Sequence, residues 1–310
     1  MVIQTLLNNF LCTFFLWLFT PHIALNSFSI LSFKQLFGFG SKLLLAGLLD
    51  SIYMNLYTLV IGKRYDSTAL GYYNRTSTIA QFPSNNLAKI VNRALFPIFC
   101  QYQKDLKALY SMYNKAVQLT TFCVFPLMTV LLCYSDSLIY ILLGDQWMQS
   151  APILKILCLA YIANPIMILM VEVINVCGRS DLALKGEYMK KMVSFILLFS
   201  TMAFGINVMC FGLVIYSIFD FLIMVYLLKM VLPLVTIKEH LKLLIPTVSL
   251  CCCITLASLI VVNIVSLPAQ LFIGLLVSIV LWILIAGLCK FTEYIFIKET
   301  VIHYLCILRK

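Results

Sequence analysis

The chain alternates long apolar stretches with short polar gaps, and most charged residues fall in the gaps. Most stretches approach the roughly 20 residues that an α-helix needs to cross a bilayer, and they are continuously apolar. This pattern predicts membrane-spanning helices and not a β-barrel. The helix of the short 191–205 stretch is expected to begin earlier, near Leu182. The predicted spans are nine: 2–19, 36–61, 72–99, 111–134, 151–176, 191–205, 208–228, 243–262 and 268–288.

Basic residues crowd every second gap between these spans. Most of the 22 Lys and Arg residues lie near residues 34–42, 104–115, 179–191, 229–242 and 290–310, and the alternate gaps hold few. Positive loops mark the cytoplasmic side of a membrane protein. The pattern therefore predicts a cytoplasmic C-terminus and, with nine crossings, an N-terminus outside.

Composition narrows the class further. The chain is 63% hydrophobic and only 11% charged, with a mean hydropathy of +1.02, whereas a soluble domain carries about 25% charged residues. The net charge of +10 is spread over several loops and forms no single stripe, so it favours contact with anionic membrane lipid over a nucleic-acid partner. We expect an all-α integral membrane protein, a polytopic helix bundle.

The gap at residues 135–149 is more than a turn. It reads SDSLIYILLGDQWMQ, which is acidic, aromatic and half apolar. This composition predicts a short amphipathic helix along the outer interface, with Trp147 at headgroup depth.

Polar side chains inside the predicted span 72–99 are the first candidates for a site, because a charge at mid-bilayer costs at least about 2.5–3.5 kcal/mol. Asn86, Lys89 and Arg93 recur at i, i+3 and i+7, and Arg75 lies eleven residues before Asn86, so one helix face carries a cationic stripe. The stripe predicts a water-filled cavity that attracts an anionic group such as a diphosphate. The alternative is that the three basic side chains only mark the interfaces.

Other spans add Asp50, Asn55, Glu172 and Asp220 to the candidate cavity residues. For these groups, pairing within the protein core stays open beside contact with a substrate or ion. Pro83 and Pro97 are expected to bend or interrupt their helix.

Enzyme motifs do not appear. The three histidines are far apart in sequence, the twelve cysteines have no metal-ligand spacing, and there is no phosphate loop, HExxH or GxSxG. We therefore predict no catalytic residue, no metal site and no cofactor.

Several segments together resemble the polysaccharide flippases of the multidrug/oligosaccharidyl-lipid/polysaccharide (MOP) exporter superfamily. Residues 71–99, GYYNRTSTIAQFPSNNLAKIVNRALFPIF, resemble a recurring stretch of these proteins, and residues 36–71 look like the opening helix of their second lobe. Residues 142–157 and 175–191 are similar to the segments around their tenth helix. The resemblance runs from about Leu31 to near Lys242, and the last two spans agree in hydropathy alone.

The resemblance implies a Wzx-like flippase of the bacterial inner membrane, which exports undecaprenyl-diphosphate-linked oligosaccharide for lipopolysaccharide or other surface polysaccharide. Full members have about fourteen helices in two lobes around a central cavity. The chain would then comprise a residual first-lobe helix (1–30), six second-lobe spans (31–242) and two further spans with a cytoplasmic tail (243–310). It would be truncated at its N-terminal side.

Three alternatives stay open. A small-molecule or drug exporter would share the fold and differ in cavity charge. A membrane-embedded polysaccharide polymerase or ligase would need a large outer loop with Arg and His, and residues 135–150 contain neither. The third is an inactive fragment, or a half that assembles with a missing or separately encoded first lobe.

Overall fold

The computed structural model describes residues 2–19 and 29–288. It divides into two compact units, Met1–Ser41 and Lys42–Lys310. The first unit contains α1 (Val2–Phe19) and the beginning of α2 (Ile30–Arg64), which continues into the second. Within α1, Phe10, Phe14, Phe15 and Phe19 contact one another along the helix.

Every predicted span corresponds to helical structure, and the described residues contain no strand. After α2, the elements are α3 (Ser67–Gln101), α4 (Leu106–Cys133), α5 (Ser135–Leu143), the 3-10 helix η1 (Asp145–Ser150), α6 (Ala151–Tyr161), α7 (Asn164–Val176), α8 (Ser180–Thr201), α9 (Ile206–Val231), α10 (Ile237–Ile264) and α11 (Leu267–Leu288). The short helix expected at 135–149 is present as α5 and η1, and α8 begins before Leu182.

Five helical stretches among the described residues are long and apolar enough to cross a membrane: Leu106–Cys133, Asp145–Val176, Ile206–Val231, Ile237–Ile264 and Leu267–Leu288. The helices α3 and α8 are not among these stretches, although each is at least 22 residues long. These are the more polar helices, and their polar residues lie in part around the cavity described below. Nine crossings therefore remain a prediction.

Side chains and glycines set the helix ends. Asp66 accepts a hydrogen bond from the backbone of Ala69 at the start of α3, and Asp105 does the same for two amides at the start of α4. Gly178 has a φ of 73°, which a residue with a Cβ rarely adopts, and it ends α7 in the left-handed conformation typical of helix C-termini.

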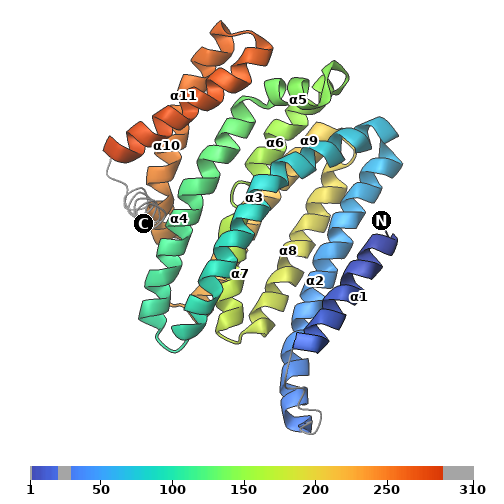
Figure 1. Cartoon of the computed structure of the whole chain (residues 1–310), viewed down its shortest axis with the longest axis vertical. Helices are drawn as coiled ribbons and strands as arrows, with labels where there is room; N and C mark the ends of the chain where they lie inside the picture. Colours follow the sequence, from blue (N-terminus) through green and yellow to red (C-terminus); the bar gives the residue numbers. More distant parts are fainter. Residues whose placement is uncertain (1, 20–28, 289–310) are drawn as a thin grey trace. The chain divides into compact units, whose positions relative to one another are not determined.

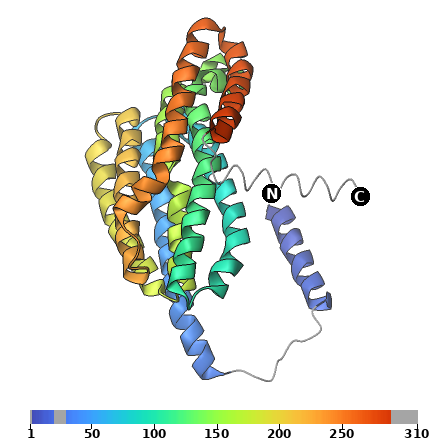
Figure 2. The same ribbon diagram turned by 90° about the vertical axis from the view of Figure 1, so that its left-hand side faces the viewer.

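The second unit is a helix bundle (Figure 1). The helix α3 packs against α4, α6 and α7, while α9 packs against α6, α7 and α8. The helix α10 runs along α4, and α11 folds back onto α10 and α5 (Figure 2). The bundle thus places α3 and α9 on either side of the α6–α7 segment.

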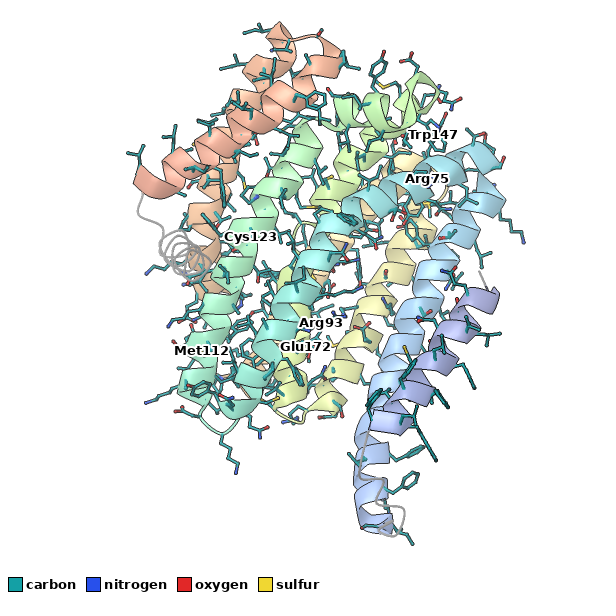
Figure 3. The ribbon with its side chains drawn as sticks, viewed as in Figure 1. Arg75, Arg93, Met112, Cys123, Trp147 and Glu172 are labelled. Atoms are coloured by element: carbon teal, nitrogen blue, oxygen red, sulfur yellow. The ribbon has the colours of Figure 1, made fainter. Side chains whose placement is uncertain are left out.

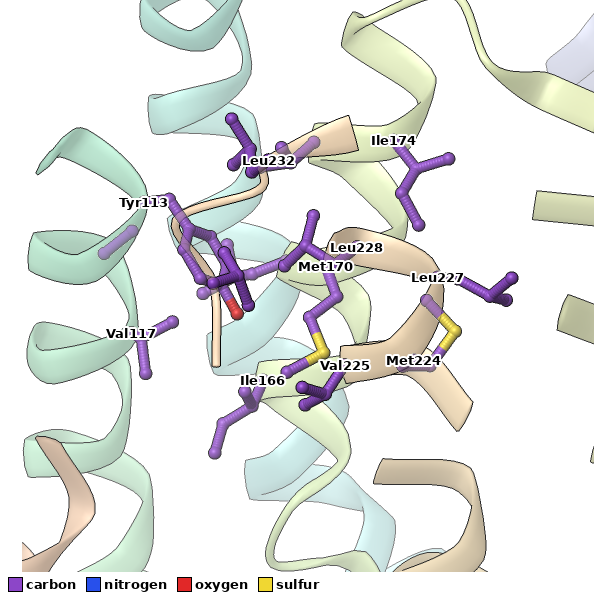
Figure 4. Packing of buried hydrophobic residues seen from close by; sticks show 14 of the residues in the cluster. Tyr113, Val117, Ile166, Met170, Ile174, Met224, Val225, Leu227, Leu228 and Leu232 are labelled. Atoms are coloured by element: carbon purple, nitrogen blue, oxygen red, sulfur yellow. The ribbon is translucent and has the colours of Figure 1, made fainter. Parts of the chain in front are cut away.

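One large apolar core joins α4, α7 and α9 (Figure 4). Tyr113 of α4, Met170 of α7 and Leu228 of α9 are fully buried in it. Many other large apolar side chains are exposed on the bundle, including Phe211 and Leu256. This distribution suits a bilayer, where the lipid and not water covers the outer surface.

The predicted span 151–176 lies within one apolar helical stretch long enough to cross a membrane, but its helix is interrupted once. The helix α6 ends at Tyr161 and α7 begins at Asn164. Pro165 has no backbone N–H to donate to the carbonyl four residues earlier, so the helical hydrogen-bond ladder stops there. In contrast, α3 continues through Pro83 and Pro97 and bends along its length (Figure 1).

Candidate functional site

A cavity of about 920 Å³ lies within the second unit. Six helices line it: α2, α3, α6, α7, α8 and α9. The face that α3 turns toward it is mostly polar, with Asn74, Ser77, Thr78, Gln81, Asn85, Asn86 and Lys89 among the lining residues. A cavity of this size is within the range of small-molecule binding sites.

Four of the predicted candidates come together in the cavity lining: Asn86, Lys89, Glu172 and Asp220. They come from three different helices, α3, α7 and α9, so only the tertiary fold brings them together. Asp220 is 7% exposed, whereas Lys89 and Asn86 are exposed.

The other candidates lie elsewhere. Arg75 and Arg93 are exposed and are absent from the lining, at opposite ends of the stretch of α3 that faces the cavity (Figure 3). Asn55 is exposed and donates to the backbone carbonyl of Ser51, one turn before it. The position of Asp50 lies in α2, but its side chain lies outside the described residues. The cationic stripe thus meets the cavity through Lys89 alone.

Sequence reasoning missed the most buried charges of the cavity. The charge pattern counts Lys190 and Lys191 among the basic residues of the cytoplasmic gap 179–191, but they lie inside α8 and are only 7% and 5% exposed. Lys190 forms ion pairs with Glu187 of the same helix and with Asp220 of α9, the latter at 3.6 Å. The available signal was the spacing of Glu187, Lys190 and Lys191 at i, i+3 and i+4, which places all three on one helix face.

Amide and hydroxyl groups form a hydrogen-bonded chain along the wall between α3 and α7. Gln81 donates to Ser77 at 2.8 Å, Asn85 donates to Gln81 at 3.2 Å, and Asn164 donates to Asn85 at 2.9 Å. The Tyr161 hydroxyl lies 3.5 Å from that of Ser77. Such groups can exchange their mutual bonds for bonds to the hydroxyl groups of a polar ligand.

The charges of the lining balance. Its basic residues are Lys89, Lys190 and Lys191, and its acidic residues are Glu172, Glu187 and Asp220. The stripe on α3 predicted a basic cavity, and the difference arises because the carboxylates come from helices distant in sequence. The described residues of the lining therefore offer a mixed electrostatic surface, in which the charges of these six groups cancel when all are ionised.

Comparison with known proteins finds relatives named for polysaccharide biosynthesis. A family model described as "Polysaccharide biosynthesis protein" matches residues 1–152. The "Teichuronic acid biosynthesis protein TuaB" of Bacillus subtilis is 27% identical over 67% of the chain, and the "Lipopolysaccharide biosynthesis protein WzxC" of Escherichia coli is 29% identical over 45%. The chain is thus similar to proteins named for polysaccharide biosynthesis, in agreement with its resemblance to the MOP-type polysaccharide flippases. It is accordingly a multi-pass membrane protein.

The fold of the chain is also similar to that of a solved structure. The "Lipid II flippase MurJ, inward closed conformation" matches 89% of the chain with a TM-score of 0.64 and 16% sequence identity, so it shows the MOP-type fold. The match covers 57% of that structure, 43% of TuaB and 29% of WzxC. The chain thus spans less than two thirds of the length of these relatives.

Proposed function

We propose that the chain takes part in moving a lipid-linked oligosaccharide across the membrane for surface polysaccharide biosynthesis. The observation that carries the proposal is the polar cavity of about 920 Å³ inside a bundle with an apolar exterior. A lipid-linked sugar needs such a pair of surfaces, because its head must avoid hydrocarbon while its tail stays in lipid.

The chemistry of the lining supports a sugar head. Hydroxyl and amide groups of α3 and α7 supply both donors and acceptors, and Tyr57, Tyr73, Tyr161 and Tyr216 add aromatic surface. Lys89, Lys190 and Lys191 can pair with a phosphate. The names of the relatives, which refer to teichuronic acid, lipopolysaccharide and lipid II, agree with this substrate class.

The mechanism we propose is alternating access. The head enters the cavity from the cytoplasmic leaflet, and a rocking motion of two lobes then exposes it on the other side. The described bundle supplies one wall of this arrangement. A first lobe, separately encoded or preceding residue 1, is the partner that the proposal requires. The location proposed is the bacterial inner membrane, with the N-terminus outside.

Deletion of the gene in its native host tests the proposal. We expect surface polysaccharide to fall and undecaprenyl-diphosphate-linked repeat units to accumulate, and a plasmid copy to restore export. Normal polysaccharide with no accumulation would contradict the proposed function. Accumulation of a cationic drug in the deletion strain, with normal polysaccharide, would point instead to the drug-exporter alternative.

A further inference from the structure

The charged side chains of the cavity gather at one end. On α3, α7 and α9, the charged residue is the last residue that the helix contributes to the lining: Lys89, Glu172 and Asp220. Successive long helices reverse direction, so α3, α7 and α9 run the same way, and the Asn85–Asn164 hydrogen bond links two of them before their charged residues. The amide and hydroxyl groups therefore occupy one end of the cavity and the charges occupy the other.

At the charged end, two neighbouring lysines share carboxylate partners. Glu187 pairs with Lys190 and Lys191 of its own helix, at 3.8 Å for Lys191, and Asp220 approaches Lys190 from α9 at 3.6 Å. All three residues of α8 line the cavity with Asp220. A buried ammonium group needs a counterion, because its desolvation is otherwise not offset. The chain's own carboxylates fill that role here.

We propose that Lys190 and Lys191 form an anion site for the diphosphate of the lipid-linked substrate, and that Glu187 and Asp220 occupy this site until the diphosphate displaces them. The inference rests on the proposed function and assigns the charged end of the cavity to the diphosphate and the amide end to the sugars. A phosphate group presents several oxygen acceptors and more charge than one carboxylate, so it can replace both acidic partners.

The exchange gives the carboxylates a role that a structural ion pair would not have. They offset the charge of the two lysines and compete with the ligand, so removing one should strengthen anion binding. If the four residues served only to hold α8 against α9, removing a carboxylate would take an ion-pair partner from a buried lysine, lower the stability and bring no gain in affinity for an anion. The sign of the change in affinity separates the two roles.

The experiment titrates inorganic diphosphate into the full chain in nanodiscs and measures the dissociation constant by calorimetry. Glu187→Gln and Asp220→Asn should each bind diphosphate about fivefold to tenfold more tightly, and Lys190→Gln should bind about tenfold more weakly. The matched controls on α8 are Asp181→Asn and Lys185→Gln, which change exposed residues outside the cavity lining and should leave the affinity unchanged.

Unchanged or weaker binding by both carboxylate variants would overturn the proposal. Thermal unfolding is followed for each variant, and if Glu187→Gln does not fold, Asp220→Asn carries the same test. Undecaprenyl diphosphate in the nanodisc should repeat the pattern. Glucuronate should not, and a site that follows the pattern with glucuronate but not with diphosphate would also overturn the assignment.

The outcome is independent of the test of the proposed function. Loss of polysaccharide export on gene deletion, together with unchanged diphosphate affinity in both Glu187→Gln and Asp220→Asn, would contradict the anion-exchange site and leave the proposed flippase function supported. Normal export in the deletion strain would contradict the proposed flippase function, whatever the diphosphate affinities of the variants.

Discussion

The Ser84 hydroxyl of α3 donates a hydrogen bond to the backbone carbonyl of Tyr161 at 3.0 Å. That carbonyl is the one to which residue 165 would donate in a continuous helix, and residue 165 is a proline. A side chain from another helix therefore satisfies the backbone group that the break between α6 and α7 leaves open. The break is thus built into the contact between α3 and the α6–α7 segment, beside the cavity.

Replacing Ser84 by Ala should destabilise the bundle by about 1–3 kcal/mol, because the buried Tyr161 carbonyl loses a donor. The midpoint of thermal unfolding in detergent measures the change. Ser249→Ala is the control, since its hydroxyl bonds to the Pro246 carbonyl of its own helix at an exposed position. An unchanged midpoint for Ser84→Ala would show that another group takes over at Tyr161.

Pro165→Ala should reduce the destabilisation that Ser84→Ala causes, because the backbone N–H of the new alanine can donate to the same Tyr161 carbonyl. In a double-mutant cycle we expect a coupling of about 1 kcal/mol between the two positions. Pro126→Ala, which changes a proline inside α4, is the matched control and should add independently to Ser84→Ala. If the effects of Ser84→Ala and Pro165→Ala on the free energy of unfolding simply add, the Ser84 hydroxyl does not replace the backbone hydrogen bond that Pro165 removes.

Among the three cations of α3, only Lys89 should matter for transport. Lys89→Gln is expected to lower export in the complementation assay about tenfold, as the loss of a charge-assisted hydrogen bond would. Arg75→Gln and Arg93→Gln, which lie outside the lining, should export at nearly the level of the unmodified chain. Equal losses in all three variants would favour the continuous cationic stripe over the cavity.

Gly274→Ala should detach α11 from its packing site. A Cβ at this position would lie 2.2 Å from the Tyr134 ring, so the ring or the helix has to move. We expect a destabilisation of about 1–3 kcal/mol, measured by thermal unfolding. Gly47→Ala, where a Cβ meets no neighbouring atom within 4 Å, is the control. Tyr134→Ala in the same chain should recover part of the loss.

The proposed topology predicts which loops share a side of the membrane. In a chain without other cysteines, Arg179→Cys and Lys238→Cys should react with an impermeant maleimide from the same side, because α8 and α9 lie between them. Gln146→Cys should react from the opposite side, because the α6–α7 segment, one predicted crossing, lies between positions 146 and 179. Labelling of positions 179 and 238 from different sides would contradict the predicted crossings.

The helices were predictable because each long apolar run is bounded by polar residues, and caps such as Asp66 and Asp105 are readable in sequence. The break at Pro165 was also readable, from the Asn164–Pro165 pair, but the apolar run around it is uninterrupted in hydropathy. A proline allows either a bend, as at Pro83, or a break. Which one occurs depends on the partners that neighbouring helices offer to the backbone.

The site was predictable only in part. Asp220 and Glu172 were candidates because a charge inside an apolar span costs free energy in the bilayer, and Lys89 and Asn86 were candidates because of their helical spacing. All four line the cavity. The same reasoning missed Lys190 and Lys191, because a lysine at the end of an apolar run is equally compatible with a position in a cytoplasmic loop and with a position on a buried helix face. Their burial depends on partners that include Asp220 on another helix, and no local pattern contains that contact.

Pairing between α8 and α9 also constrains how the protein is made. A helix that carries Glu187, Lys190 and Lys191 enters hydrocarbon poorly by itself, since each such charge costs roughly 2.5–3.5 kcal/mol at the centre of a bilayer. The following helix is strongly apolar and brings Asp220 to Lys190. We therefore expect the ribosome to deliver the two to the membrane as a hairpin, with α8 held back at the insertion machinery until α9 has emerged.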